Sequence, residues 1–161
     1  MTPGLIRESV VAERISWVRR MLVSIQRLPL GSYDEFTSDP KNAAAAESYL
    51  RRGIEALLDL GRHLLTKGFG LAVTEYKDIG LKLAEESVLS RERGALLRQI
   101  AGYRNRMVHF YHEVSNEELY RLCTESLKDL EEILEALVIW MLDNPDKLDR
   151  LPDTEPSPGN R

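Results

Sequence analysis

"AAAAESYLRRGIEALLDLGRHLL", residues 43–65, decides the fold class of this 161-residue chain. It opens with four alanines, the residue type with the highest helix propensity. Asp39 can cap a helix whose first residue is Pro40, because the missing N–H costs no hydrogen bond there. Gly68 is expected to end this helix. Apolar residues at spacings of three and four then form one stripe of a long amphipathic helix: Leu50, Ile54, Leu57, Leu58, Leu64 and Leu65.

The segment before this helix has a helical pattern too. Residues 29–38 are polar and contain glycine, so we expect a loop between the two helices. The first helix is predicted to end near Leu28 and Pro29. Its apolar stripe consists of Val11, Ile15, Val18, Leu22 and Ile25.

Three further helices are predicted downstream. A short one covers residues 76–86, and a fourth begins near Arg91 and is expected to fray near its end. Ser115 with Glu118 three residues later forms a capping box and starts a fifth helix that reaches Met141. No window alternates with period two over the length of a strand. We therefore predict an all-α, up-and-down bundle of about five helices.

Length and composition predict one folded domain followed by a tail. A chain of 161 residues with 43% hydrophobic content suits a single core. Residues 143–161 contain four of the seven prolines and no apolar period, so we expect a disordered tail after a helical domain at 1–142. Residues 136–142 are apolar on every helix face, which fits either contact with a second subunit or a central helix of a monomeric bundle.

Several classes of protein are disfavoured by composition. The single cysteine, Cys123, cannot form an internal disulfide, and no apolar run is long enough for a membrane span or a signal peptide. We therefore expect a cytoplasmic protein without membrane contact. A formal net charge of −4 argues against a protein that coats nucleic acid, although it leaves room for a local basic patch.

Such a patch is present in residues 91–106, which contain five arginines, no lysine and only one acid, Glu92. A guanidinium group binds phosphate oxygens in pairs, whereas the lysine ammonium is a hydrated point charge. For Arg91, Arg93 and Arg98 we expect ion pairs with acids of the first, second and fifth helices. Arg104 is the better candidate for a phosphate because His109 follows it closely.

Arginine and histidine together supply both halves of metal-free phosphodiester chemistry. Imidazole can take a proton from a ribose 2′-hydroxyl or return one to the leaving oxygen, and arginine stabilises the charge that develops on phosphorus. Five residues of ideal helix turn the chain by about 500°, which leaves Arg104 and His109 roughly 140° apart. Either the helix loosens before His109, or a second subunit completes the pair.

The remaining histidines carry no predicted chemistry. His63 is expected to be an exposed residue in the middle of the long helix. His112 is close to His109, but adjacent residues such as His109, His112 and Glu113 rarely converge on one ion. No metal and no cofactor are therefore predicted.

Residues 104–111, RNRMVHFY, read R-N-x-x-x-H-x-Y. This pattern resembles the R-x(4–6)-H signature of HEPN domains, and specifically the R-x(4)-H-x-Y form of HepT-like toxins. The resemblance extends to other segments in the same order: residues 43–65, 76–90 and 115–137 are similar to the family's second, third and closing helices. It covers about residues 5–142.

The resemblance implies a HEPN-like homodimer that acts as a metal-independent endoribonuclease. Arg104 and His109 would be catalytic and Asn105 would support them, with a 2′,3′-cyclic phosphate and a 5′-hydroxyl as products. The implied partners are RNA, a second copy of the chain and an MNT-type nucleotidyltransferase antitoxin. That antitoxin would silence the toxin by attaching AMP to Tyr111. The alternative is a non-catalytic helical dimer that serves as substrate or binding partner of such a transferase.

Overall fold

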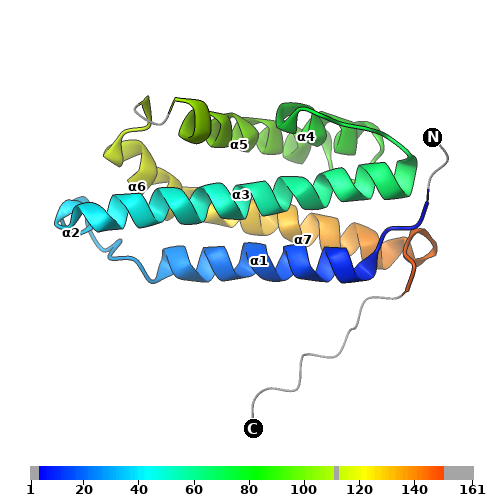
Figure 1. Ribbon diagram of the computed structural model, residues 1–161, viewed down its shortest axis with the longest axis horizontal. Helices are drawn as coiled ribbons and strands as arrows, with labels where there is room; N and C mark the ends of the chain where they lie inside the picture. Colours follow the sequence, from blue (N-terminus) through cyan, green and yellow to red (C-terminus); the bar gives the residue numbers. More distant parts are fainter. Residues whose placement is uncertain (1–3, 111–112, 151–161) are drawn as a thin grey trace, which may run out of the picture.

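The computed structural model describes residues 4–110 and 113–150, and within these residues the chain is helical with no strand. Its long helices lie along the long axis of the molecule (Figure 1). α1 (Glu8–Gln26) and α3 (Pro40–Phe69) run antiparallel, α7 (Leu127–Asp143) lies behind them, and α5 (Arg91–His109) covers α3 on the other side. The prediction of an all-α bundle is confirmed.

α3 is the central helix, and its start was predicted correctly. Asp39 caps it by accepting a hydrogen bond from the backbone N–H of Lys41 at 2.9 Å, ahead of Pro40. Its predicted apolar stripe is buried. The predicted end was wrong, because the helix continues through Gly68 and Gly70 forms the C-cap with a left-handed φ of 68°. Gly68 lies against Ile6 instead, where an added Cβ would be 3.1 Å from the Ile6 side chain.

The predicted loop at residues 29–38 contains a short helix, α2 (Tyr33–Thr37). Ser32 caps it by accepting a hydrogen bond from the backbone N–H of Glu35 at 3.1 Å. Phe36 is completely buried and packs against Tyr120, at 5.6 Å between ring centroids. A helix of five residues is too short to show a period in the sequence, so the cap at Ser32 and the tertiary contact of Phe36 together explain why it forms.

α4 (Tyr76–Glu85) and α5 approach each other more closely than side chains would allow. Gly80 and Gly94 face each other at the crossing, and a Cβ on Gly94 would lie 2.6 Å from the carbonyl oxygen of Gly80. Such a distance is shorter than real Cβ contacts, so only glycine fits at either position. This backbone contact fixes the orientation of α5 and therefore of the side chains at its C-terminal end.

The predicted fifth helix is two helices, α6 (Asn116–Glu125) and α7, with a break at Ser126. The predicted cap is confirmed, because Ser115 Oγ accepts a hydrogen bond from the backbone N–H of Glu118 at 3.1 Å. The sequence hides the break because the apolar stripe continues through it. In α7, Leu137 and Met141 are buried in the bundle.

The uniformly apolar stretch at residues 136–142 therefore has two different faces. One face packs in the core, whereas Ile139 and Leu142 are about half exposed, at 50% and 47%. The described part of a single chain thus accounts for one face and leaves the other open to solvent.

The folded part extends beyond the predicted domain boundary at 142. A 3-10 helix, η2 (Pro145–Lys147), follows α7, and the next residues pair with the N-terminal segment. The N–H of Ile6 donates to the carbonyl of Lys147 at 2.8 Å, and the N–H of Asp149 donates to the carbonyl of Ile6 at 2.9 Å. The rest of the predicted tail, residues 151–161, lies outside the described residues.

None of the helices in residues 4–110 and 113–150 combines the length and the apolar character that a membrane span requires. Cys123 is buried as a free thiol, and burial raises its pKa to about 12. A thiol with such a high pKa is almost entirely protonated at neutral pH and behaves as a small apolar side chain.

Candidate functional site

The last two turns of α5 contain three of the predicted site residues, Arg104, Asn105 and His109. The helix stays regular to His109, and the N–H of Phe110 still donates to the carbonyl of Arg106 at 2.8 Å. Of the two alternatives left open by the sequence, a helix that loosens before His109 is therefore not what the structure shows. Arg104 and His109 remain on different faces of one helix, about 140° apart. The fourth predicted residue, Tyr111, lies outside the described residues, as does His112.

Arg104 is held from three directions. Its Nε donates to Oε1 of Glu55 on α3 at 3.0 Å, and its Nη1 donates to Oδ1 of Asn105 at 3.1 Å. Its Cζ lies 4.7 Å from the centroid of the Tyr76 ring, in a cation–π contact. The Arg104 side chain is 19% exposed and that of Glu55 is 25% exposed. The guanidinium is thus half-buried but still reachable from solvent.

The ring of Tyr76, at the start of α4, is itself fixed. Its hydroxyl donates to Oδ1 of Asp59 at 2.9 Å, and a second guanidinium, from Arg62, lies 4.7 Å from the ring centroid. Arg62 in turn donates to the carbonyls of Val73 and Thr74, both at 2.9 Å. Burial raises the pKa of Tyr76, and the hydrogen bond to Asp59 raises it further, so the hydroxyl stays protonated as the donor.

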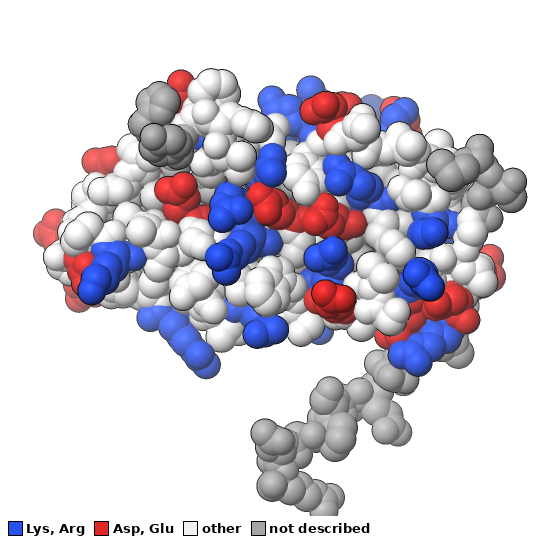
Figure 2. Space-filling view, viewed as in Figure 1, with Lys and Arg blue, Asp and Glu red and all other residues white. Residues whose placement is uncertain are grey.

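On the face of the molecule that Figure 2 shows, acidic and basic side chains alternate across the middle, over α3. Arg51 pairs with Glu55 at 3.6 Å, and Arg62 pairs with Asp59 at 3.6 Å. The acids of α3 therefore offset much of the positive charge that the arginines bring. Around Arg104 and Tyr76, the basic patch expected from the sequence is therefore a largely neutralised network of ion pairs.

His109 has very different surroundings from Arg104. It is exposed at the last residue of α5, and its ring lies 6.5 Å from that of Phe110, edge to face. In the part of the chain that the structure describes, its side chain makes no hydrogen bond or ion pair. Val108 and Phe110 on either side are apolar and exposed, at 37% and 51%. The imidazole is therefore free to meet a ligand or another protein surface.

Arg106, between these two residues, joins α5 to α6. It binds both carboxylate oxygens of Glu118, at 2.6 Å and 2.9 Å, and donates to the carbonyl of Glu113 at 3.1 Å. The hydrogen bond to Glu118 raises the pKa of Arg106 above its ordinary value. Both Nη groups of this guanidinium therefore serve contacts within the chain, which makes Arg106 a weaker candidate than Arg104 for a phosphate ligand.

The ion pairs expected for the other arginines do not form with the predicted helices. Arg98 lies 3.7 Å from Asp78 on α4 and also donates to the carbonyl of Lys77 at 3.3 Å. Arg91 and Arg93 are exposed, and neither forms an ion pair within residues 4–110 and 113–150. The predicted pairing with acids of the first, second and fifth helices is therefore wrong for all three, because Arg98 pairs with an acid of the short helix α4 and the other two form no ion pair in the described residues.

The prediction that His63 is an exposed helix residue is also wrong. Its Nε2 accepts a hydrogen bond from the backbone N–H of Arg7 at 3.0 Å, just before the start of α1. Partial burial lowers the pKa of His63, and the nearby cations of Lys67, Arg7 and Arg14 lower it further. A neutral imidazole is needed to accept this bond, so His63 links the N-terminal segment to α3.

No group of three or more histidine, cysteine, aspartate or glutamate side chains comes together as metal ligands within the described residues.

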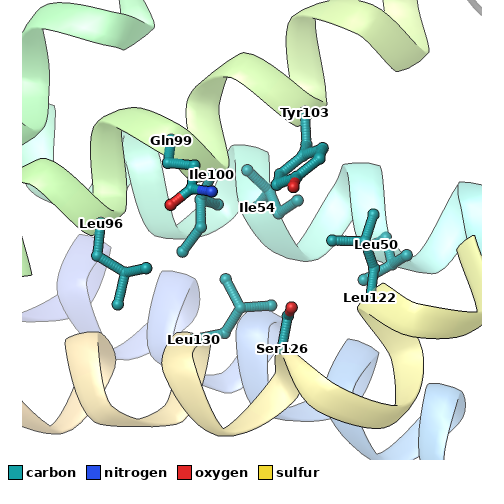
Figure 3. Close-up of a pocket in the computed structure, with 9 residues that line it drawn as sticks. All are labelled: Leu50, Ile54, Leu96, Gln99, Ile100, Tyr103, Leu122, Ser126 and Leu130. Atoms are coloured by element: carbon teal, nitrogen blue, oxygen red, sulfur yellow. The ribbon is translucent and has the colours of Figure 1, made fainter. Parts of the chain in front are cut away.

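A separate apolar pocket lies between α3, α5 and the junction of α6 with α7 (Figure 3). Its cavity volume is about 70 Å³, and Gln99, Tyr103 and Ser126 are its polar lining residues. Tyr103 precedes Arg104, but one residue of helix turns by about 100°, so the two face different directions.

Sequence reasoning missed Glu55 and Tyr76, which surround Arg104. Glu55 is 49 residues away from Arg104 in the chain and is one of several acids on α3. Tyr76 stands at the first turn of a short helix. No local signal marks either residue, because their roles depend on the packing of α3 and α4 against α5.

Comparison with known proteins agrees with this fold and motif. The family model of HepT-like ribonucleases matches residues 18–137. The tRNA nuclease HepT of Aphanizomenon flos-aquae is 22% identical over 124 residues, which cover 76% of this chain and 84% of the relative.

Two solved structures share the fold. One is the tri-AMPylated HEPN toxin of Shewanella oneidensis in complex with its MNT antitoxin, with a TM-score of 0.73 and 21% identity over 81% of this chain and 97% of that chain. The other is a cytosolic protein of unknown function from Bacillus subtilis, with a TM-score of 0.71 and 20% identity over 84% and 91%. Because the family match spans more than half of the chain and includes Arg104 and His109, this protein belongs to the HepT-like ribonuclease family.

Proposed function

We propose that this protein is the toxin of a toxin–antitoxin pair and acts as a metal-independent endoribonuclease. Membership of the HepT-like family supports this assignment, as does the curated relative that is a tRNA nuclease. The observation that carries the proposal is that one helix end presents both an oriented guanidinium, at Arg104, and an exposed imidazole, at His109.

In the proposed reaction, the ribose 2′-oxygen attacks the adjacent phosphorus while a neutral imidazole of His109 takes the 2′ proton. Arg104 stabilises the negative charge that develops on the phosphoryl oxygens. A protonated imidazole gives a proton to the departing 5′-oxygen. The products are a 2′,3′-cyclic phosphate and a 5′-hydroxyl, and no metal is required to balance the reaction.

A symmetric dimer would supply the groups that one chain cannot bring together. Since α5 is regular through His109, Arg104 and His109 of one chain point in directions about 140° apart. A second copy, packed against the exposed Val108 and Phe110, would place its own His109 near Arg104 of the first. Two histidines in one cleft would then serve as base and acid, so activity would fall at both low and high pH.

The proposed antitoxin is an MNT-type nucleotidyltransferase that attaches AMP to Tyr111. Tyr111 follows His109 by two residues. AMP at that position would add negative charge and bulk beside Arg104 and His109, where the RNA phosphate would bind. The AMPylated toxin of the Shewanella oneidensis complex is consistent with such regulation.

The test is cleavage of RNA by the purified chain, compared with His109→Ala and Arg104→Ala variants. We expect each variant to lose at least about 100-fold in rate, as is usual when a catalytic acid–base or charge-stabilising group is removed. The wild-type rate should be unchanged in EDTA, and mass spectrometry should detect a cyclic phosphate. If the variants cleave RNA as well as the wild type does, the assignment of these residues is wrong.

The second candidate function is a non-catalytic helical dimer that serves as the substrate or binding partner of a nucleotidyltransferase. The ion pair of Arg104 with Glu55 favours it, because a neutralised guanidinium attracts phosphate less strongly. Intact-mass measurement after co-expression with the transferase separates the two functions. Addition of AMP that Tyr111→Phe abolishes, together with no cleavage of RNA by the unmodified chain, would support this second function.

A further inference from the structure

We propose that Glu55 and Tyr76 are positioning residues, which hold the guanidinium of Arg104 with its outer edge directed at the RNA phosphate. This inference rests on the proposed ribonuclease function and names two residues outside the R-x(4)-H motif. Glu55 comes from the middle of α3 and Tyr76 from the first turn of α4. Three helices therefore meet at one side chain.

The hydrogen bonds of Arg104 leave one edge of the guanidinium for a ligand. The group has five N–H donors, one on Nε and two on each Nη. Glu55 accepts from Nε at 3.0 Å and Asn105 accepts from Nη1 at 3.1 Å. Within the described part of the chain, nothing accepts from Nη2 or from the second hydrogen of Nη1. One Nη2 hydrogen points to the end of the side chain and the other lies beside Nε–H, so Nη2 can donate to phosphate oxygens from either edge.

Tyr76 restricts the remaining freedom of the group. The flat ring lies 4.7 Å from the Arg104 Cζ and is tied to α3 through Asp59, at 2.9 Å from the tyrosine hydroxyl. α4 in turn is held to α5 by the backbone contact of Gly80 with Gly94. The ring thus belongs to the same rigid unit as Arg104, and its position does not depend on the exposed end of α5.

The negative charge of Glu55 indicates that its role is to position Arg104 and not to strengthen phosphate binding. A carboxylate 3.0 Å from the Arg104 Nε repels an incoming phosphate and weakens binding of the RNA ground state. A site built only for affinity would not place an acid there. Fixing a catalytic group in the productive orientation, by contrast, raises kcat even if it leaves KM higher.

Two replacements of Glu55 distinguish these effects. Glu55→Gln keeps an oxygen that can accept from Nε but removes the charge, whereas Glu55→Leu removes both and keeps a similar volume. We expect Glu55→Leu to lower kcat about tenfold and Glu55→Gln to stay within about threefold of the wild type. Both should lower KM for RNA, because the repelling charge is gone. Equal kcat values for the two variants would overturn the positioning role of Glu55.

Tyr76 has a corresponding pair of variants. Tyr76→Phe keeps the ring beneath Arg104, and Tyr76→Leu removes it. We expect kcat to fall about tenfold in Tyr76→Leu and to stay within about threefold in Tyr76→Phe.

Glu47→Gln is the matched control for Glu55, since it changes the same charge on the same helix without contacting Arg104. It should leave kcat and KM unchanged, and thermal unfolding should verify that all variants are folded.

Hydrogen exchange at Arg104 tests its hydrogen bond to Glu55 without an activity measurement. The 15N-labelled Nε–H of Arg104 should exchange slowly with solvent in the wild type and in Glu55→Gln, and rapidly in Glu55→Leu. If the chain cleaves RNA and Arg104→Ala abolishes cleavage, an unchanged kcat in Glu55→Leu refutes the positioning role and leaves the nuclease intact. If no variant cleaves RNA, the proposed function fails, and rapid exchange of this N–H in the wild type refutes the inference separately.

Discussion

The two ends of α5 are held in opposite ways. Its N-terminal half is fixed to α4 by backbone contact at Gly80 and Gly94, with no room for a side chain. Its C-terminal end is fixed by polar pairs, Arg104 with Glu55 and Arg106 with Glu118, and carries an exposed His109. The difference teaches how one helix can serve both stability and chemistry. Close packing sets its direction, while the end that presents reactive groups stays accessible.

The largest expected effect comes from filling the glycine contact. Gly94→Val places a branched side chain against the carbonyl of Gly80, so α4 and α5 must separate. We expect a loss of about 3 kcal/mol in the free energy of unfolding, measured by urea denaturation. Gly102→Ala on the same helix is the control, because a Cβ there lies 3.7 Å from Lys77, an ordinary contact. Alanine at that position should stabilise the protein by about 0.5–1 kcal/mol.

A smaller effect is expected at the polar end. Arg106→Met breaks the bidentate pair with Glu118 that joins α5 to α6. Both side chains are partly exposed, at 37% and 23%, so solvent screens the interaction. We expect a coupling energy of about 1 kcal/mol or less in a double-mutant cycle with Glu118→Gln, decreasing at high salt. A coupling as large as the cost of Gly94→Val would contradict the contrast between the two ends.

His63 offers a second polar contact, on α3, where the hydrogen bond from the backbone N–H of Arg7 can be tested by pH. Its pKa is lowered in the folded protein, chiefly by burial, so the unfolded chain binds the proton more readily. The contribution of neutral His63 to the free energy of unfolding is therefore fully present above the unfolded pKa of about 6.5. It is lost as the pH falls through the folded pKa. Because the side chain is partly exposed, the change is on the order of 0.5 kcal/mol. Comparing unfolding of the wild type and His63→Gln at pH 7.5 and 5.5 measures it.

The smallest effect on the isolated chain is expected at the exposed tip of α5. Phe110→Ser removes a side chain that is 51% exposed, so the free energy of unfolding of the monomer should change by less than about 0.5 kcal/mol. If the tip contacts a second copy, sedimentation should show weaker self-association in the same variant. A large loss of monomer stability would mean that the tip is part of the core, contrary to the comparison.

Much of the fold was predictable because periodicity and caps are local signals. The stripes of α1 and α3, the cap at Asp39 and the cap at Ser115 were all correct. The errors have a common cause. α2, the break at Ser126 and the extension to Arg150 depend on contacts between residues far apart in the chain, such as Ile6 with Lys147. A local pattern contains no information on such contacts.

The sequence by itself determined the helical class, the order of the main helices and the motif with Arg104 and His109, because helix propensity, apolar period and short motifs are properties of neighbouring residues. Only the tertiary structure decided what surrounds that motif. It paired Arg104 with Glu55 and Tyr76, tied Arg106 to Glu118 and left His109 exposed. These outcomes follow from the packing of α3, α4 and α6 around α5, and packing brings together side chains that the sequence keeps apart.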